Sequence, residues 1–70
     1  MDWKRQARVL IRTELAKQDM SYKDLARRLE GIGLNIEPKA ITNKVSRGSF
    51  SFVFFLQCMH VLGVESIQLK

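Results

Sequence analysis

The 70 residues of this chain leave room for one small domain, residues 1–70, and for no linker to a second. With 46% apolar and 27% charged residues, the composition is typical of a globular chain and excludes the class that stays disordered. The net charge of +5 favours anionic partners, and all of the excess lies in residues 1–47, because residues 48–70 hold only Lys70 against Glu65.

A first helix is predicted from Trp3 to Gln18, because apolar residues recur there at the spacing of one helical face: Trp3, Ala7, Leu10, Ile11 and Leu15. Trp3 falls in register with this face and is expected in the core. Arg5, Arg8 and Arg12 share the opposite face. They form either a ridge that contacts phosphate or a solvated surface, and the solvated surface is the favoured interpretation.

A second helix is predicted to begin after Ser21, because Ser21 and Asp24 have the spacing of a capping box. Its inward stripe consists of Tyr22, Leu25, Ala26 and Leu29. The helix is expected to end at the glycines of residues 31–33, since glycine tolerates the positive φ of a helix C-terminus. Tyr22 has the right chemistry to stack on bases, but its register favours a place in the core.

A third helix is expected to begin at Pro38, since proline is tolerated in the first turn of a helix, with Glu37 as its cap. Gly48 is expected to end it. Ile41 and Val45 are its inward residues.

The outward face of this third segment carries side chains suited to contacting DNA. At about 100° per residue, Asn43 lies about 170° from the direction of the two aliphatic side chains. Around it lie Lys39, Ala40, Ser46 and Arg47, with Lys44 on a flank. Asn pairs with adenine, Arg with guanine, and Lys with phosphate or guanine, while small residues allow close approach. A solvated short helix has a similar composition, so DNA binding is a hypothesis at this point.

A fourth helix is predicted from a cap at Ser51 through Leu62 and Gly63, and it is more apolar than a surface helix needs to be. One face consists of Phe52, Phe55, Leu56, Met59 and Leu62; a second face consists of Phe54, Cys58 and Val61. In the tail, Ile67 and Leu69 alternate with polar residues, which suggests a short strand. The apolar surplus suggests a homodimer, whose interface is expected to comprise Phe54, Cys58, Val61, Ile67 and Leu69.

Catalysis is not expected, since the chain has one His and one Cys and lacks a paired set of catalytic groups. His60 lies two residues after Cys58 on the same helix, so the two side chains point about 200° apart. We expect no metal, no cofactor and no small-molecule substrate. A lone cysteine fits a reducing cytoplasm, and the longest apolar run, Phe52–Leu56, is too short to span a bilayer. The expected location is therefore cytoplasmic, without membrane insertion.

Three segments occur in order along the chain: Ser21–Leu29 (SYKDLARRL), Ile41–Gly48 (ITNKVSRG), and an apolar helix that ends in Leu62-Gly63-Val64. In this order they resemble the lambda-repressor-like (XRE/Cro-type) helix-turn-helix domain over about residues 9 to 64. The chain is similar in particular to small bacterial domains of this type that have no known activity. Two features depart from the pattern. The turn between the paired helices is about five residues longer, and Tyr22 stands where the family often has a Gln that binds phosphate.

The resemblance implies an all-α, four-helix domain that binds double-stranded DNA in a sequence-specific manner, as small bacterial or phage transcriptional regulators do. The DNA contacts that it implies, together with Ser46 from the outward face, are Ser21, Tyr22, Lys23, Lys39, Asn43, Lys44, Ser46 and Arg47. The alternative is a protein-interaction module on the same scaffold, which docks through the Phe-rich fourth helix and the tail.

Overall fold

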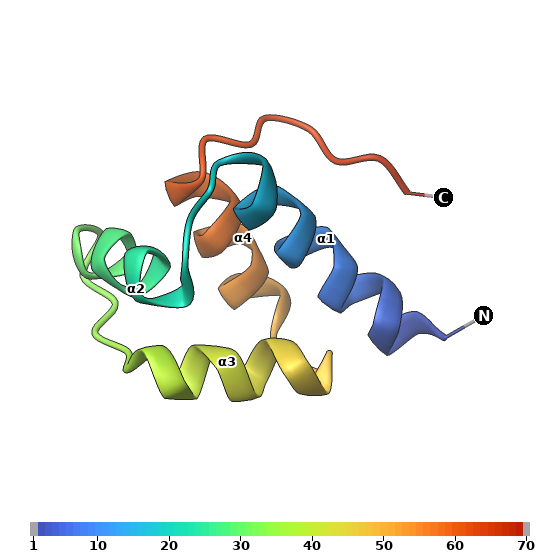
Figure 1. Cartoon of the computed structure of the whole chain (residues 1–70), viewed down its shortest axis with the longest axis horizontal. Coiled ribbons are helices and arrows are strands. Elements are labelled where there is room, and N and C mark those ends of the chain that lie inside the picture. The colour runs from blue at the N-terminus through green and yellow to red at the C-terminus, as the bar shows by residue number, and fades with distance from the viewer. Residues whose placement is uncertain (1, 70) are drawn as a thin grey trace.

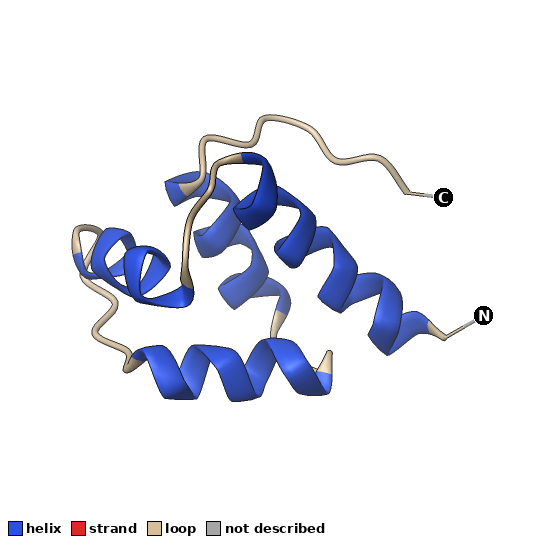
Figure 2. Ribbon diagram, in the orientation of Figure 1, coloured by secondary structure: helices blue, strands red, loops and turns tan. Residues whose placement is uncertain are grey.

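Four α-helices make up the regular secondary structure of residues 2–69, the part of the chain that this computed structural model describes (Figure 2). The helices are α1 (Trp3–Lys17), α2 (Tyr22–Glu30), α3 (Pro38–Arg47) and α4 (Phe52–Val61). The predicted all-α, four-helix class is confirmed, and each helix lies within two residues of its expected ends.

The helix ends are set by the local signals in the sequence. Ser21 and Asp24 form the predicted capping box, with the Ser21 hydroxyl accepting from the Asp24 N–H at 3.1 Å and the Asp24 carboxylate accepting from the Ser21 N–H at 3.0 Å. Ser51 caps α4 by accepting from the Phe54 N–H. Glu37 precedes Pro38 at the start of α3 as predicted, although its side chain makes no capping hydrogen bond.

The core of the described chain is entirely apolar. Its buried side chains come from all four helices and the residue after α4: Ile11, Leu15, Leu25, Leu29, Ile41, Val45, Phe54, Phe55, Cys58, Met59 and Leu62. α3 and α4 each pack against both α1 and α2. In Figure 1, α3 lies along one side of the molecule, with the other helices all on its inner side. The opposite side of α3 is therefore open to solvent.

The orientation of α4 differs from the one expected. Phe54 and Cys58, expected to contact a second copy, are buried in this chain's own core, at 6% and 0% exposure. Phe52 and Leu56 are 70% and 50% exposed. The sequence of α4 offers two overlapping apolar stripes, and only the packing of α1 and α2 decides which of them is covered. At the C-terminal end of α4, the Arg28 side chain of α2 donates a hydrogen bond to the Val61 carbonyl oxygen at 3.0 Å.

Trp3 was expected in the core, and this prediction is wrong, because the side chain is 73% exposed. Trp3 begins α1 at the end of that helix that lies farthest from α2 in Figure 1, so neighbouring helices do not cover it. Tyr22 is half-buried and packs against the core cluster, in agreement with its register.

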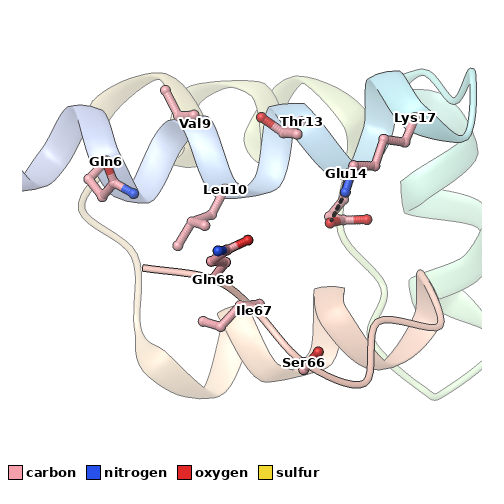
Figure 3. A pocket seen from close by; sticks show the side chains of 9 residues that line it. All are labelled: Gln6, Val9, Leu10, Thr13, Glu14, Lys17, Ser66, Ile67 and Gln68. Carbon is pink, nitrogen blue, oxygen red and sulfur yellow. Dashed lines mark hydrogen bonds and ion pairs between the residues drawn. The ribbon is translucent and has the colours of Figure 1, made fainter. Parts of the chain in front are cut away.

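The predicted strand in the tail is also wrong, since residues 64–69 contain no strand. A strand needs a neighbour to accept its backbone hydrogen bonds, and the described chain offers no sheet edge. The tail instead borders a groove of about 720 Å³ beside α1. Figure 3 shows Leu10 of α1 and Ile67 of the tail in the space between the two segments.

Gly48, directly after α3, lies against the backbone at the start of α1. Its φ of 65° is left-handed, a conformation that costs other residues about 1 kcal/mol or more. A Cβ at this position would lie 2.8 Å from the Lys4 carbonyl carbon and closer still to its oxygen. The backbones of α1 and α3 therefore approach so closely here that only glycine fits.

We predict that Gly48→Ala lowers the free energy of unfolding by about 3 kcal/mol, from left-handed strain and the clash with Lys4 together. Gly63→Ala is the matched control, because Gly63 has a φ of 71° but no atom within 4 Å of an added Cβ. Gly63→Ala should lower the free energy of unfolding by only about 1 kcal/mol. Urea unfolding followed by circular dichroism measures both, and equal losses would contradict the close approach.

Candidate nucleic-acid interface

The outer face of α3 carries the candidate DNA-contacting side chains in exposed positions. Ile41 and Val45 are completely buried, at 0% exposure, while Lys39, Asn43, Ser46 and Arg47 are exposed. The last three line one shallow cavity of about 260 Å³. The predicted division of α3 into an aliphatic inner face and a polar outer face is confirmed.

Lys44 lies on the flank of α3, as its angle on the helix predicts. It is half-buried, and its Nζ lies 5.7 Å from the centre of the Phe54 ring, within the range of a cation–π interaction. The ammonium group of Lys44 is thereby directed toward the ring of a core residue.

The three candidate DNA contacts at the start of α2 differ in whether their polar groups already make hydrogen bonds. Ser21 is already engaged on both sides: its hydroxyl accepts from the Asp24 N–H and also donates to the Asp24 carboxylate at 3.0 Å. Lys23 is exposed and borders a groove of about 320 Å³ that reaches Pro38 of α3. Tyr22 is half-buried, and its phenol oxygen accepts from Arg12 of α1 at 3.4 Å.

Hydrogen bonds to Ser21 lower the pKa of the Asp24 carboxyl below its ordinary value of 3.8. The largest cause is the Ser21 backbone N–H, followed by the Ser21 hydroxyl. Asp24 therefore keeps its negative charge at the start of α2, next to the Ser21 hydroxyl. That charge disfavours a phosphate at the Ser21 position.

Two arginines of α1 reach this region, although the sequence pattern does not indicate a contact with α3. Arg8 donates to the Ser46 carbonyl oxygen at 2.9 Å, and Arg12 donates to the Ser46 hydroxyl at 3.4 Å. Their face of α1 was interpreted as solvated. A spacing of four residues shows that both lie on one side of a helix, but it does not show which element that side meets.

Positive charge at this surface is not neutralised by neighbouring acids. Within residues 2–69, the ion pairs are Lys17 with Glu14 at 3.4 Å and Arg27 with Asp24 at 3.7 Å. The cations of the outer face of α3, and Arg8 and Arg12 of α1, belong to neither pair. The α3 side of the described chain is therefore a cationic surface.

A second exposed feature is apolar and lies on α4. Phe52, Val53 and Leu56 are 70%, 64% and 50% exposed. We call these three residues the α4 patch. In the tail, Ile67 and Leu69 are exposed at 42% and 71%, and Val61 is half-buried.

Cys58 and His60 point in different directions, as their spacing predicts. Cys58 is completely buried, and this burial raises the pKa of its thiol to about 12, so the thiol stays protonated near neutral pH. His60 is exposed. Across residues 2–69, His, Cys, Asp and Glu side chains do not gather in groups of three or more that would hold a metal ion. None of the described helices has both the length and the apolar content needed to span a bilayer.

The sequence of residues 3–67 matches a family described as a domain of unknown function, DUF6471, and the chain belongs to this family. The match spans all four helices. Neither a curated protein nor a solved structure matches the chain.

We predict that Ser21→Ala raises the pKa of Asp24 only part of the way toward its ordinary value, because alanine removes the hydroxyl but keeps the backbone N–H that lowers this pKa most. The lost cap also costs about 1 kcal/mol of stability. Because the folded-state pKa of Asp24 is lowered, its stabilising effect is present above pH 3.8 and disappears as the pH falls through the folded-state value. NMR titration of the carboxyl carbon measures the shift. An unchanged Asp24 pKa in Ser21→Ala would contradict the capping-box account.

Proposed function

We propose that this protein binds double-stranded DNA, with α3 in the major groove and the basic residues of α2 and α3 on the phosphates. The observation that carries this proposal is the division of α3. Its aliphatic residues are buried, and Asn43 and Arg47 are exposed on the opposite face. The resemblance to lambda-repressor-like helix-turn-helix domains supports it from the sequence. The corresponding biological role is a small bacterial or phage transcriptional regulator.

The side chains of α3 supply complementary contacts. Asn43 is suited to the N6 and N7 atoms of adenine, and Arg47 to the O6 and N7 atoms of guanine. Lys39, close to the start of α3, is suited to a phosphate at the edge of the groove. Ten residues make α3 about 15 Å long, and an α-helix with its side chains is about 10–12 Å in diameter, which fits a major groove about 12 Å wide.

The long connection between α2 and α3 is compatible with this arrangement. Residues 31–37 separate the two helices, whereas a helix-turn-helix usually has a turn of about three or four residues. α2 nevertheless packs directly against α3. In Figure 1, α2 begins close to α3. The Arg12 side chain donates hydrogen bonds both to Tyr22 of α2 and to Ser46 of α3. The start of α2 and the outer face of α3 are thereby held near each other in spite of the longer turn.

We predict that Asn43→Ala and Arg47→Ala each weaken binding to a selected duplex by about 1–3 kcal/mol, whereas Lys39→Ala reduces the slope of log affinity against log salt by about one. Sites are first enriched from random duplexes, and affinities are then measured by fluorescence anisotropy. Lys17→Ala is the control, since it removes the same charge from a residue already paired with Glu14. The absence of any binding to random duplexes at low salt would refute the proposal.

A second candidate function follows from the α4 patch, which is exposed and apolar and lies in the first half of α4. A protein-interaction surface or a homodimer contact on this patch would bury Phe52, Val53 and Leu56. A homodimer would also place two copies of α3 on neighbouring half-sites of DNA. The interface expected from the sequence is revised accordingly, because Phe54 and Cys58 are not accessible to a second copy.

We predict that the protein is a dimer at micromolar concentration and that Leu56→Lys makes it a monomer, because a charge in the α4 patch opposes burial. Size-exclusion chromatography with light scattering measures the mass. His60→Lys is the control, as it adds charge at an exposed position of the same helix outside the patch. A monomeric wild-type protein would remove the homodimer hypothesis and would leave DNA binding by a single copy.

A further inference from the structure

Where α1, α2 and α3 meet, four side chains form a cluster of hydrogen-bond donors. We call Arg8, Arg12, Tyr22 and Ser46 the junction cluster. Arg12 lies at its centre: its Nε donates to the Tyr22 phenol oxygen and its Nη2 donates to the Ser46 hydroxyl, both at 3.4 Å. Arg8 donates to the Ser46 carbonyl oxygen at 2.9 Å. Through these two guanidinium groups, α1 contacts both α2 and α3.

We infer that the junction cluster binds a phosphate group, and that Arg12 is its principal ligand. When the phosphate is one of the DNA backbone, this inference rests on the proposed function. The chemistry that it requires is that of a tetrahedral oxyanion, whether the oxyanion belongs to DNA or to a free phosphate compound.

The hydrogen bonds of the cluster leave donors without acceptors. Tyr22 and Ser46 each accept from Arg12, so their own O–H hydrogens remain available. Within residues 2–69, neither hydroxyl donates a hydrogen bond to another protein group. Arg12 uses two of the roughly five N–H donors that a guanidinium carries. An oxyanion is the ligand that accepts from guanidinium and hydroxyl groups at the same time.

The cluster also holds positive charge that no carboxylate of the described chain neutralises. Lys4, Arg8 and Arg12 follow one another at intervals of four residues along α1, a spacing at which like charges repel. The ion pairs of residues 2–69 involve none of the three. A bound phosphate would offset this repulsion, and the charge-assisted hydrogen bonds would be stronger than those that Arg12 makes now.

Members of the junction cluster border two separate shallow cavities. Arg12 and Tyr22 border a shallow cavity of about 390 Å³, and Ser46 borders the cavity of about 260 Å³ that Asn43 and Arg47 also line. The cluster therefore flanks the outer face of α3. A backbone phosphate bound there would lie beside the groove that α3 is proposed to enter.

The start of α2 offers a poorer phosphate site than the junction cluster does. The Ser21 hydroxyl is engaged with Asp24, and the Asp24 carboxylate stays charged beside it. Tyr22, by contrast, has its phenol group next to a guanidinium. The principal ligand of the inferred phosphate site, Arg12, therefore comes from α1, with Tyr22 of α2 and Ser46 of α3 beside it.

The test compares Arg12→Gln with Arg5→Gln. Both changes remove one positive charge from exposed positions of α1, but the Arg5 side chain makes no hydrogen bond to the cluster. In the first arm, inorganic phosphate is titrated into labelled protein at constant ionic strength, and amide shifts are followed. Saturable shifts at Tyr22 and Ser46 are expected for the wild type and for Arg5→Gln, and their loss is expected for Arg12→Gln.

The second arm measures affinity for a duplex of random sequence at low salt. Arg12→Gln should bind about tenfold more weakly than the wild type, as expected for a lost charge-assisted hydrogen bond, and clearly more weakly than Arg5→Gln. Tyr22→Phe removes only the hydroxyl and should reduce the affinity for the duplex about threefold. Thermal unfolding of each variant shows whether it is folded at the temperature of the experiment.

The outcomes separate this inference from the proposed function. Arg12-dependent phosphate binding without any duplex binding would retain the phosphate site, assign it to a free phosphate compound, and refute the DNA proposal. A different result would be duplex binding that Arg12→Gln and Arg5→Gln weaken equally, without saturable amide shifts on addition of phosphate. It would overturn the inference that the junction cluster binds phosphate and would leave the DNA proposal standing.

Discussion

The burial of Ile41 and Val45 determines the direction of every other side chain of α3. Both are completely removed from solvent, and each contributes about 1.5–3 kcal/mol through that burial. An α-helix is rigid over ten residues, so fixing these two fixes Asn43 and Arg47 on the opposite side. If α3 were rotated by half a turn, two aliphatic side chains would become exposed, and an amide and a guanidinium would be buried without partners. The polar outer face is thus a consequence of core packing.

α1 determines where α3 lies. Gly48 lets the backbone at the end of α3 approach the Lys4 carbonyl, and Arg8 donates to one of the last carbonyls of α3. A cation at this end of a helix also interacts favourably with the helix dipole. The same helix supplies Arg12 to the hydroxyls of Tyr22 and Ser46. α1 therefore supports α3 in the fold and, in the proposed function, adds a phosphate contact next to it.

The features that could be predicted from the sequence are those determined by residues close together along the chain. The capping box of Ser21 and Asp24 and the left-handed Gly48 involve residues only a few positions apart, so their chemistry is visible in the sequence. The two faces of α3 were predictable for the same reason, because two aliphatic residues among polar ones leave one possible orientation.

The failures concern contacts between segments far apart in sequence. α4 is apolar on several sides, so the sequence could not indicate that Phe54 and Cys58 face the core while Phe52 and Leu56 face solvent. Trp3 matched the periodicity of α1, but the helix extends beyond the part of the core that its neighbours cover. The contacts of Arg8 and Arg12 with α3 could not be predicted for the same reason, since they join residues more than thirty positions apart.

Amide shifts of the labelled protein during titration with a random-sequence duplex at low salt distinguish DNA binding through α3 from binding through the α4 patch. The account predicts that the largest shifts fall on residues 39–47 of α3 and at the start of α2. Shifts centred on Phe52, Val53 and Leu56, with α3 unperturbed, would contradict it.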